Sequence, residues 1–485
     1  MLFNSVTYIL FLFIVVLIYY ALQSVRLRNI WLLGSSYFFY MQWNAKYGLL
    51  ILLVTLFTYI GAIIISHDKI KSNNKYKRFI FVLFTILSLA ILLFFKYLGM
   101  LFGHLNLLFR VLNVKIHITR LNILLPVGIS FFTLQSLGYL IDVYRGDINC
   151  EYDFIDYALF VSFFPQLVAG PIERSRNLLN QFKNKISFKY MNLQKGFYYI
   201  LYGLMIKMVI ADNLAILVDK IYSNPVKFSG LYLVIATLAF SIQIYCDFYG
   251  YSIIAKGSSI LLGINLMDNF NSPYLSSSIR EFWHRWHISL STWFRDYLYI
   301  PLGGNRRGFI KNNINILIIF LISGLWHGAS ISFVLWGLIN GVYNIIENIF
   351  NKFIKFKMNI LTKILSILFV YIIICFSWIF FRAGSFTNTK IILTNLFYNF
   401  KMVNLIDLLN VWNLPYKMTD GTVFGILVLT IVDILKYNHL NLIDKIIKLN
   451  PILRYVLSIL LIFFIIIFGC YGGIYNPKQF IYFQF

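Results

Sequence analysis

Long apolar runs recur along the whole of this 485-residue chain, and they restrict it to folds that cross a lipid bilayer. Residues 314–346 form one such run, and about 20 apolar residues in a helix are enough to span the hydrocarbon core. The chain is 60% hydrophobic and only 12% charged, which leaves too little polar surface to cover a water-soluble globule. The runs do not alternate in polarity as barrel strands would. We therefore predict an all-α polytopic membrane protein with roughly ten to twelve transmembrane helices.

The formal net charge of +24 is concentrated in the segments between the apolar runs. The basic clusters lie at residues 26–28, 69–78, 174–189, 280–311, 352–357 and 436–454. This pattern is typical of the cytoplasmic loops of membrane proteins, so the charge does not indicate a nucleic-acid partner. With these loops inside, both termini are expected on the extracytoplasmic side, and membrane lipids are the expected surroundings.

One integral-membrane domain is expected over residues 1–485, without a large soluble module. Within it, residues 121–146 contain Pro126 and Gly128 early and charged side chains late. A broken or re-entrant helix fits this segment better than a simple span, because freed backbone groups at membrane depth must be sheltered by protein. The four cysteines have no spacing that indicates disulfides or a zinc site.

His327 is the first candidate for a chemical role, because it lies inside the apolar run of residues 314–346. An ionisable side chain at membrane depth is costly and indicates a functional site by default. A neutral imidazole can take a proton from a hydroxyl near neutral pH, so His327 is a candidate general base. The alternative is a histidine that only bonds a neighbouring helix, with Gly324 and Gly328 allowing close helix packing. Under the functional interpretation, the same glycines give a long substrate access to the ring.

Histidines, arginines and tryptophans crowd together between Glu281 and Ser291, and a period of 3.6 residues predicts an amphipathic helix there. Its apolar face carries Trp283, Trp286, Leu290, Trp293 and Tyr297, and its polar face carries His284, His287, Ser291 and Arg295. His287 is the second candidate for chemistry. The alternative is an interfacial helix whose histidines only face water. A metal site is not expected, because neither a cysteine pair nor a carboxylate cluster lies nearby in the sequence.

Asp247 is a carboxylate within an otherwise apolar run. Two interpretations are open. Asp247 orients a histidine or balances an arginine at the site, or it forms an ion pair that only helps the helices to pack.

These residues resemble the membrane-bound O-acyltransferases, and within them the bacterial branch typified by the alginate O-acetylation membrane protein. The resemblance is carried by residues 282–306, by residues 164–172 and by Gly324-Leu325-Trp326-His327-Gly328-Ala329. It implies a disc of helices with re-entrant segments and a central tunnel, in which His327 is the catalytic histidine and His287 the second active-site histidine. His284 falls at a position that the family does not fix, and it is not carried over as catalytic.

The resemblance implies an enzyme of the bacterial inner membrane that moves an acyl group, most simply acetyl, from a cytoplasmic thioester across the bilayer. The acceptor is an exported cell-envelope polysaccharide such as peptidoglycan or an alginate-like glycan, reached through an extracytoplasmic SGNH/GDSL-like O-acetyltransferase. No bound cofactor is expected, and acetyl-CoA or an acyl carrier protein is the donor. In this scheme His327 is the general base and His287 positions or polarises the thioester carbonyl. The side chains expected to bind substrate are Trp326, Arg285, Ser291, Arg295, Asn305, Arg306 and Asp247.

Tyr482 is the third catalytic candidate and belongs to an aromatic segment, residues 476–485, that is expected as an extracytoplasmic tail. One interpretation is an acyl relay, in which His327 activates the Tyr482 hydroxyl as a nucleophile, and the resemblance makes the same suggestion. The other is an aromatic anchor at the membrane interface.

Two other functions are open. Within the family, the alternative is D-alanyl transfer from a carrier protein to teichoic acid, although Pro301-Leu302-Gly303-Gly304-Asn305-Arg306 favours the acetyl branch. In a different class, a proton-coupled transporter or flippase would use buried histidine and aspartate to relay protons. That class predicts inverted repeats, and none stands out in the sequence.

Overall fold

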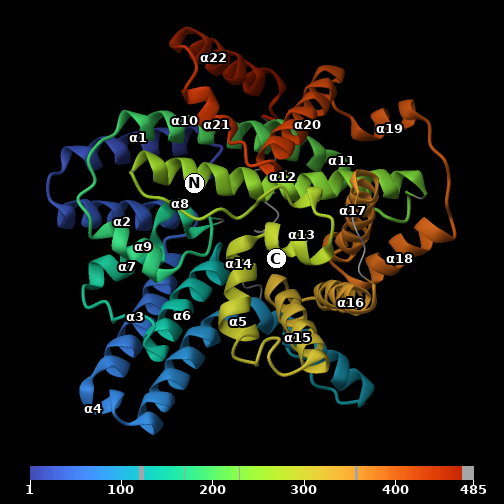
Figure 1. Cartoon of the computed structure of the whole chain (residues 1–485). Helices are drawn as coiled ribbons and strands as arrows, with labels where there is room; N and C mark the ends of the chain where they lie inside the picture. Colours follow the sequence, from blue (N-terminus) through green and yellow to red (C-terminus); the bar gives the residue numbers. More distant parts are fainter. Residues whose placement is uncertain (120–124, 169, 229, 355–358, 472–485) are drawn as a thin grey trace. The chain divides into compact units, whose positions relative to one another are not determined.

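The computed structural model describes the chain except for residues 120–124, 169, 229, 355–358 and 472–485. In the described residues all regular secondary structure is helical, and no β-strand occurs (Figure 1). The prediction of an all-α protein is therefore confirmed. Tyr482 and the rest of the predicted tail lie outside the described residues.

The chain divides into two compact units, one of residues 1–192 and 258–267, the other of residues 193–257 and 268 onward. The first unit contains α1 (Val6–Ala21), α2 (Val25–Met41), α3 (Tyr47–Ser66), α4 (Asp68–Lys71), α5 (Asn74–Val111), α6 (Ile129–Arg145), α7 (Phe154–Ser162), α8 (Phe164–Leu167) and α9 (Ser175–Phe182). Most of the second is formed by α10 (Tyr190–Met205), η1 (Ile206–Ala211), α11 (Asp212–Tyr222), α12 (Leu231–Leu261), η2 (Pro273–Leu275), α13 (Ile279–Arg285), α14 (Ile288–Phe294), η3 (Arg295–Tyr299), α15 (Phe309–His327), α16 (Ile331–Phe353), α17 (Ile360–Arg382), α18 (Phe386–Phe397), α19 (Leu405–Trp412), α20 (Tyr416–Tyr437), α21 (Leu442–Ile447) and α22 (Pro451–Phe468). Whether the two units act as one functional domain stays a prediction.

Nine helical stretches in the described part of the chain are long and apolar enough to cross a membrane. They are α3, α5, the continuous run from α10 to α11, α12, α15, α16, α17, α20 and α22, while α1 is a shorter apolar helix. The chain is thus a multi-pass membrane protein, as predicted. The number of crossings and the side on which each terminus lies stay predictions.

In the described part of the irregular segment expected at residues 121–146, which begins at residue 125, helix α6 begins at Ile129. Gly128 precedes it with a left-handed backbone, φ 75°. A Cβ at Gly128 would lie 2.7 Å from the carbonyl oxygen of Leu167, so both its conformation and its contact require glycine.

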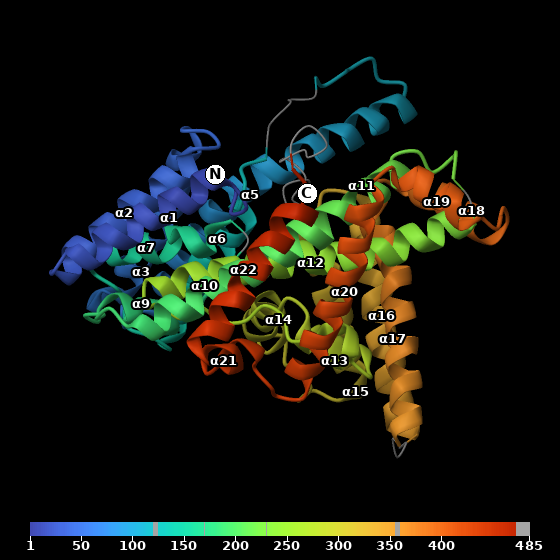
Figure 2. The ribbon, with the colours of Figure 1, turned by 90° about the horizontal axis from the view of Figure 1, so that it is seen from above.

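Glycines allow α15 and α16 to pack closely. A Cβ at Gly324 would lie 2.3 Å from the Phe333 carbonyl oxygen, and one at Gly337 would lie 2.3 Å from the Phe320 carbonyl oxygen. A Cβ at Gly328 would meet the Phe333 ring at 2.2 Å. Phe333 fills the space beside Gly324 and Gly328, which favours the helix-packing interpretation of both glycines. α16 in turn packs along α17, as Figure 2 shows.

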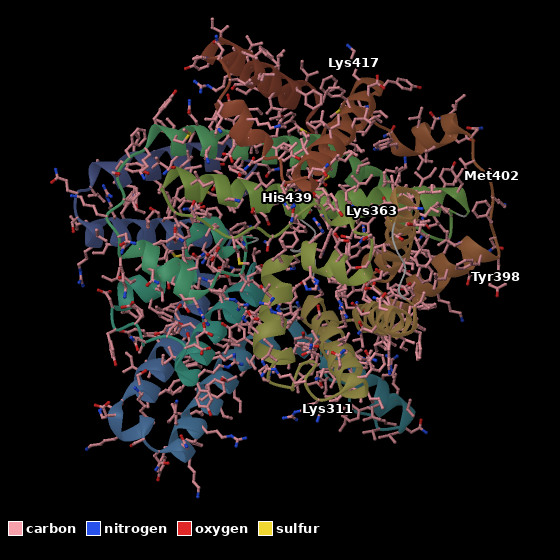
Figure 3. The ribbon with its side chains drawn as sticks, viewed as in Figure 1. Lys311, Lys363, Tyr398, Met402, Lys417 and His439 are labelled. Atoms are coloured by element: carbon pink, nitrogen blue, oxygen red, sulfur yellow. The ribbon has the colours of Figure 1, made fainter. Side chains whose placement is uncertain are left out.

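Basic side chains of the second unit are exposed at the ends of its apolar helices. Lys311 lies in the first turn of α15 and Lys417 in the first turn of α20, and both are labelled in Figure 3. At these positions the ammonium groups lie away from the apolar middle of each helix.

Candidate active site

The predicted amphipathic helix over residues 281–297 is interrupted. α13 ends at Arg285, Trp286 is extended, and His287 has a left-handed backbone with φ 44° before α14 begins. The prediction of one helix with an apolar and a polar face is therefore wrong. A non-glycine residue in the left-handed region costs roughly 1–3 kcal/mol and is typical of functional sites.

Contacts from a distant segment explain the interruption. The backbone N–H of Ile288 donates to Asn269 O at 2.9 Å, and that of Asn271 donates to Arg285 O at 3.0 Å. These bonds satisfy groups that a continuous helix would have paired internally. Trp286 also buries its indole, with the Phe270 ring centroid 5.1 Å away. Tertiary packing thus overrides the local helical pattern.

The start of α13 is fixed from two sides. The Ser278 hydroxyl oxygen accepts a hydrogen bond from the Glu281 backbone N–H at 3.0 Å, which caps the helix. Glu347 of α16 accepts from the backbone N–H of Ile279. A carboxylate at this position also interacts favourably with the helix dipole. The segment that carries His284 is therefore held against α16.

His327 is the last residue of α15 and only 6% exposed. Its imidazole contacts three aromatic rings, with centroids 4.8 Å from Trp326, 5.0 Å from Trp336 and 5.2 Å from Phe381. Trp326 also lies 6.1 Å from the ring of His287. One indole is thus shared by the two histidines.

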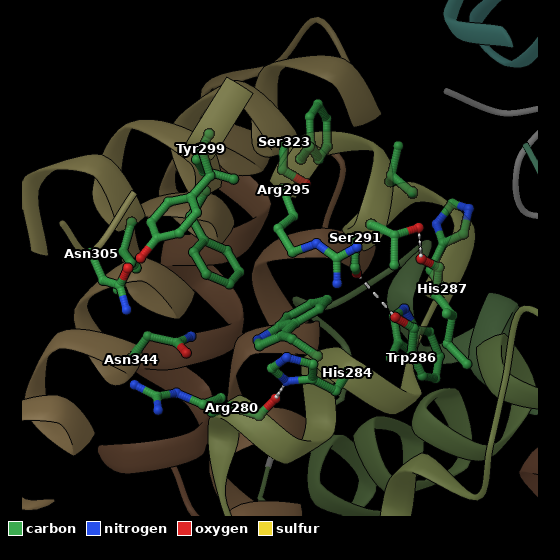
Figure 4. A pocket seen from close by; sticks show the side chains of 18 of the residues that line it. Arg280, His284, Trp286, His287, Ser291, Arg295, Tyr299, Asn305, Ser323 and Asn344 are labelled. Carbon is green, nitrogen blue, oxygen red and sulfur yellow. Dashed lines mark hydrogen bonds between the residues drawn. The ribbon is translucent and has the colours of Figure 1, made fainter. Parts of the chain in front are cut away.

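A cavity of about 430 Å³ brings the two histidines together, and this volume is typical of small-molecule sites. Its polar lining consists of Arg280, His284, His287, Ser291, Thr292, Arg295, Tyr299, Asn305, Asn312, Ser323, His327 and Asn344. Apolar side chains of α13 to α15 complete the wall, among them Trp283, Leu290 and Phe320. Residues from both faces of the helix predicted from sequence therefore share one cavity. Figure 4 shows Ser291 and Arg295 on one side and Asn305 and Asn344 on the other.

Three of the predicted substrate-binding residues, Ser291, Arg295 and Asn305, line this cavity. Arg285 does not. Its Nε lies 2.9 Å from the Glu281 carboxylate, and its guanidinium lies over the Tyr437 ring at 4.5 Å.

Trp326, Arg306 and Asp247 are also not among the lining residues. Trp326 packs beside the rings of both histidines, and Arg306 is exposed in the loop between η3 and α15. The roles of all these residues in catalysis or binding stay predictions.

Asp247 takes part in a buried charge cluster. Its Oδ1 lies 2.6 Å from Lys207 Nζ, which is also 2.6 Å from Asp212 Oδ1, and all three side chains are 3–4% exposed. This geometry favours the interpretation of Asp247 as a packing ion pair. Lys207 and Asp212 were not predicted from the sequence, although ionisable residues inside an apolar run are the same signal that identified His327.

The polar side of the cavity includes two arginines, Arg280 and Arg295. Arg280 donates to Asn348 Oδ1, and Arg295 Nε lies 2.8 Å from an Asp296 carboxylate oxygen. The Arg295 side chain is 54% exposed, so solvent screens this pair and its guanidinium is available to an anionic ligand. His284 Nδ1 lies 2.7 Å from Arg280 O.

Burial sets the charge state of His287, which is 2% exposed and lies outside the membrane-spanning helices. Desolvation lowers the pKa of its imidazole from 6.5 to about 3. The ring is therefore neutral at physiological pH. A neutral imidazole keeps one nitrogen as donor and one as acceptor, which suits it to polarise a carbonyl.

Among the described residues, no group of three or more His, Cys, Asp and Glu side chains is placed to hold a metal ion. The groups gathered at the cavity are imidazoles, guanidinia, amides and hydroxyls. This set suits proton transfer and the binding of a polar, anionic ligand.

Comparisons with known proteins agree with this chemistry. The model of the membrane-bound O-acyltransferase family matches residues 150–387, which include both histidines. The probable alginate O-acetylase AlgI of Pseudomonas aeruginosa is 37% identical over 380 residues, covering 77% of this chain and 71% of that protein.

Two further relatives have other acceptors in their names. The peptidoglycan O-acetyltransferase of Helicobacter pylori is 37% identical over 381 residues, covering 73% of this chain and 71% of the relative. The teichoic acid D-alanyltransferase of Bacillus subtilis is 29% identical over 282 residues, covering 55% of this chain and 70% of the relative.

Proposed function

This chain belongs to the membrane-bound O-acyltransferase family and is a membrane acyltransferase, and on that premise we propose its substrates and mechanism. The donor is a cytoplasmic acetyl thioester, and the acetyl group crosses the bacterial inner membrane for O-acetylation of an exported cell-envelope polysaccharide. Acetyl is favoured over D-alanyl because the relatives that match the larger share of this chain are named for O-acetylation.

The observation that carries the proposal is the shared cavity of His287 and His327. A thioester carbonyl placed between them has an acceptor for the nucleophile's proton on one side and a hydrogen-bond donor for its oxygen on the other. Trp326 packs beside both imidazole rings.

The reaction exchanges one acyl bond for another. An acceptor hydroxyl attacks the thioester carbon while His327 takes the hydroxyl proton, and His287 stabilises the negative charge that develops on the carbonyl oxygen. The new O–C bond forms, the C–S bond breaks, and the proton on His327 passes to the leaving thiolate. The products are an ester and a free thiol.

The lining of the cavity matches the phosphopantetheine arm that coenzyme A and acyl carrier proteins share. Arg280 and Arg295 can bind phosphate, and the side chains of Asn305, Asn312 and Asn344 can bond the amides of the arm. Because these features recognise only the arm, either carrier can deliver the acetyl group.

The acetyl group must then reach the outer face, where an extracytoplasmic SGNH/GDSL-like transferase places it on the glycan. We propose that the Tyr482 hydroxyl is the acceptor and relays the acetyl group to that partner. A phenyl ester has a better leaving group than an alkyl ester, which suits an intermediate that must be passed on.

The test is complementation of a gene deletion with the wild-type protein or with His327→Gln. Mass analysis of the envelope polysaccharides should show that ester-linked acetate is lost on deletion and restored by the wild type. His327→Gln should restore none, although the protein is inserted at normal amounts, because a general base contributes roughly 10²- to 10⁴-fold to rate. Near-normal acetate with His327→Gln would contradict the mechanism.

A second measurement separates acyl transfer from transport. Purified protein in lipid vesicles should release free thiol from acetyl-CoA or an acetylated carrier protein, in a single burst when Tyr482 is the only acceptor and in repeated turnovers when an external acceptor is added. A transporter that relays protons would leave the thioester intact.

A further inference from the structure

Three helices enclose His327 in an aromatic wall, which we define as Trp326, Trp336 and Phe381. These residues belong to α15, α16 and α17, and each ring centroid lies within 5.2 Å of the imidazole. Trp336 and Phe381 are each 1% exposed. His327 also lines the cavity, whereas no ring of the wall does. The imidazole therefore lies at the boundary between open and filled space.

The aromatic wall is supported from behind. Trp336 stacks on Trp378 with centroids 6.0 Å apart and planes 19° from parallel. Phe381 packs edge-on against Phe333 at 5.1 Å and against Trp378 at 5.4 Å. Rings packed at the density of a protein interior cannot move aside without repacking their neighbours. The wall is thus a fixed boundary.

The position of this boundary constrains the acyl group, if the acyl transfer proposed above is correct. The donor arm occupies the cavity, and the thioester carbonyl must lie within reach of His327. The acyl chain leaves the carbonyl carbon on the side away from the sulfur, and hence away from the arm. With the thioester in this orientation, the methyl of an acetyl group lies beside His327, and each further carbon points toward the wall.

We propose that Trp336 and Phe381 determine which acyl groups are transferred, admitting acetyl and excluding longer chains. The selection acts on the length of the acyl group and not on the carrier, because the two rings lie beyond the thioester carbon. Trp326 closes the same space but also contacts His287, so Trp336 and Phe381 are the residues that can be changed without altering the contact between Trp326 and His287.

The experiment compares acetyl and butyryl donors on the same preparation of purified protein. Phe381→Ala should raise the ratio of kcat/KM for butyryl-CoA to that for acetyl-CoA by at least about tenfold, because one methylene in an apolar pocket is worth roughly 10- to 200-fold. Trp336→Ala should act in the same direction, and Phe381→Leu should give a smaller increase. The ratio is independent of the fraction of protein that is folded, since both donors meet the same molecules.

Phe380→Ala is the matched control. Phe380 is the neighbouring residue on α17, is also buried, and packs on Phe376 at 5.7 Å. The same substitution there should leave the ratio at the wild-type value.

The outcomes are distinct. Thioester turnover by the wild type with a ratio that is unchanged in Phe381→Ala, Phe381→Leu and Trp336→Ala would overturn the assignment and leave the acyltransferase mechanism intact. A rise in Phe380→Ala equal to that in Phe381→Ala would also overturn it, because general loosening would then explain both. Absence of any transfer by the wild type would refute the proposed function instead.

Discussion

The imidazole of His287 and the indole of Trp326 lie 6.1 Å apart between ring centroids, although they come from different elements of the second unit. Trp326 precedes His327 in the chain and contacts its ring at 4.8 Å. One packed side chain therefore lies against both histidines, while backbone hydrogen bonds of Ile288 and Asn271 fix the turn at His287. Hydrogen-bond geometry at a reacting carbonyl depends on such fixed placement.

We expect His287→Asn to lower acetyl transfer by roughly 10²- to 10³-fold, the loss typical of removing one group that stabilises a developing oxyanion. Asparagine tolerates the left-handed backbone at this position, so the variant tests the imidazole and not the turn. Turnover of an acetyl thioester by purified protein measures the effect. His284→Asn, which changes an exposed histidine on the same cavity, should be mild, and equal losses in both variants would contradict a special role for His287.

Stability should depend on pH through His287. Because its pKa is lowered to about 3 in the folded protein, the ring gains a proton below about pH 6.5 only when the chain unfolds. The folded state should therefore lose stability as the pH falls from 6.5 toward 3, by up to about 1.4 kcal/mol per pH unit, and this contribution is constant above pH 7. Thermal unfolding in detergent at pH 7.0 and 5.5 should show a smaller drop for His287→Asn than for the wild type. An equal drop would mean that another group dominates.

Lys207→Met should destabilise the protein by roughly 3–5 kcal/mol, because it leaves the buried carboxylates of Asp212 and Asp247 without their shared cation. The combined variant Lys207→Met, Asp212→Asn, Asp247→Asn should recover most of the loss, since it removes all three charges together. Thermal unfolding midpoints of the solubilised proteins measure both. A Lys207→Met protein as stable as the wild type would show that the cluster is not held by charge.

The class of the protein could be predicted from sequence, because the length and polarity of apolar runs depend only on local composition. His327 could be identified for the same reason. The turn at His287 could not, because it depends on two backbone hydrogen bonds, one accepted by Asn269 and one donated by Asn271, that no periodicity reveals. The ion pair between Asp247 and Lys207 could not be predicted either, because 40 residues separate the two in the sequence.

The cavity lining could also be predicted only in part from the sequence. Ser291, Arg295 and Asn305 lie near the histidine motif in sequence and were predicted, whereas Asn312 and Asn344 come from α15 and α16 and were not. Only the packing of α13 to α16 places these side chains around one space.

Charge reversal at Arg306 and Arg307 should raise the KM for the donor, because these exposed arginines attract an anionic carrier toward the cavity. The difference from the wild type should shrink as salt rises from 0.05 to 0.5 M, since the Debye length falls from about 14 to 4 Å. Steady-state kinetics at several ionic strengths test this. Lys417→Glu on α20 is the control, and donor kinetics that are unchanged at every salt concentration would leave the arginines with no role in donor capture.

Tyr482→Phe should abolish polysaccharide acetylation if the hydroxyl is the acyl relay, because phenylalanine keeps the aromatic ring and removes only the nucleophile. Mass analysis of the wild-type protein incubated with isotope-labelled acetyl thioester should find the label on Tyr482, and the His327→Gln protein should carry none. Full acetylation by Tyr482→Phe would reject the relay and favour the membrane anchor.

The π-helical turn η1 determines the sequence spacing at which the buried charges of Lys207 and Asp212 can meet. Lys207 and Asp212 are five residues apart, and both reach the same buried point because η1 widens the turn between α10 and α11. In a regular α-helix, residues five apart point in directions about 140° apart, and the lysine could not meet this aspartate. Removing one of the four residues between them would restore a regular α-turn and leave the charges four residues apart, again on one face, so the five-residue spacing and the π-turn are required together. The buried ion cluster is specified by the register of the backbone as much as by the side chains that form it.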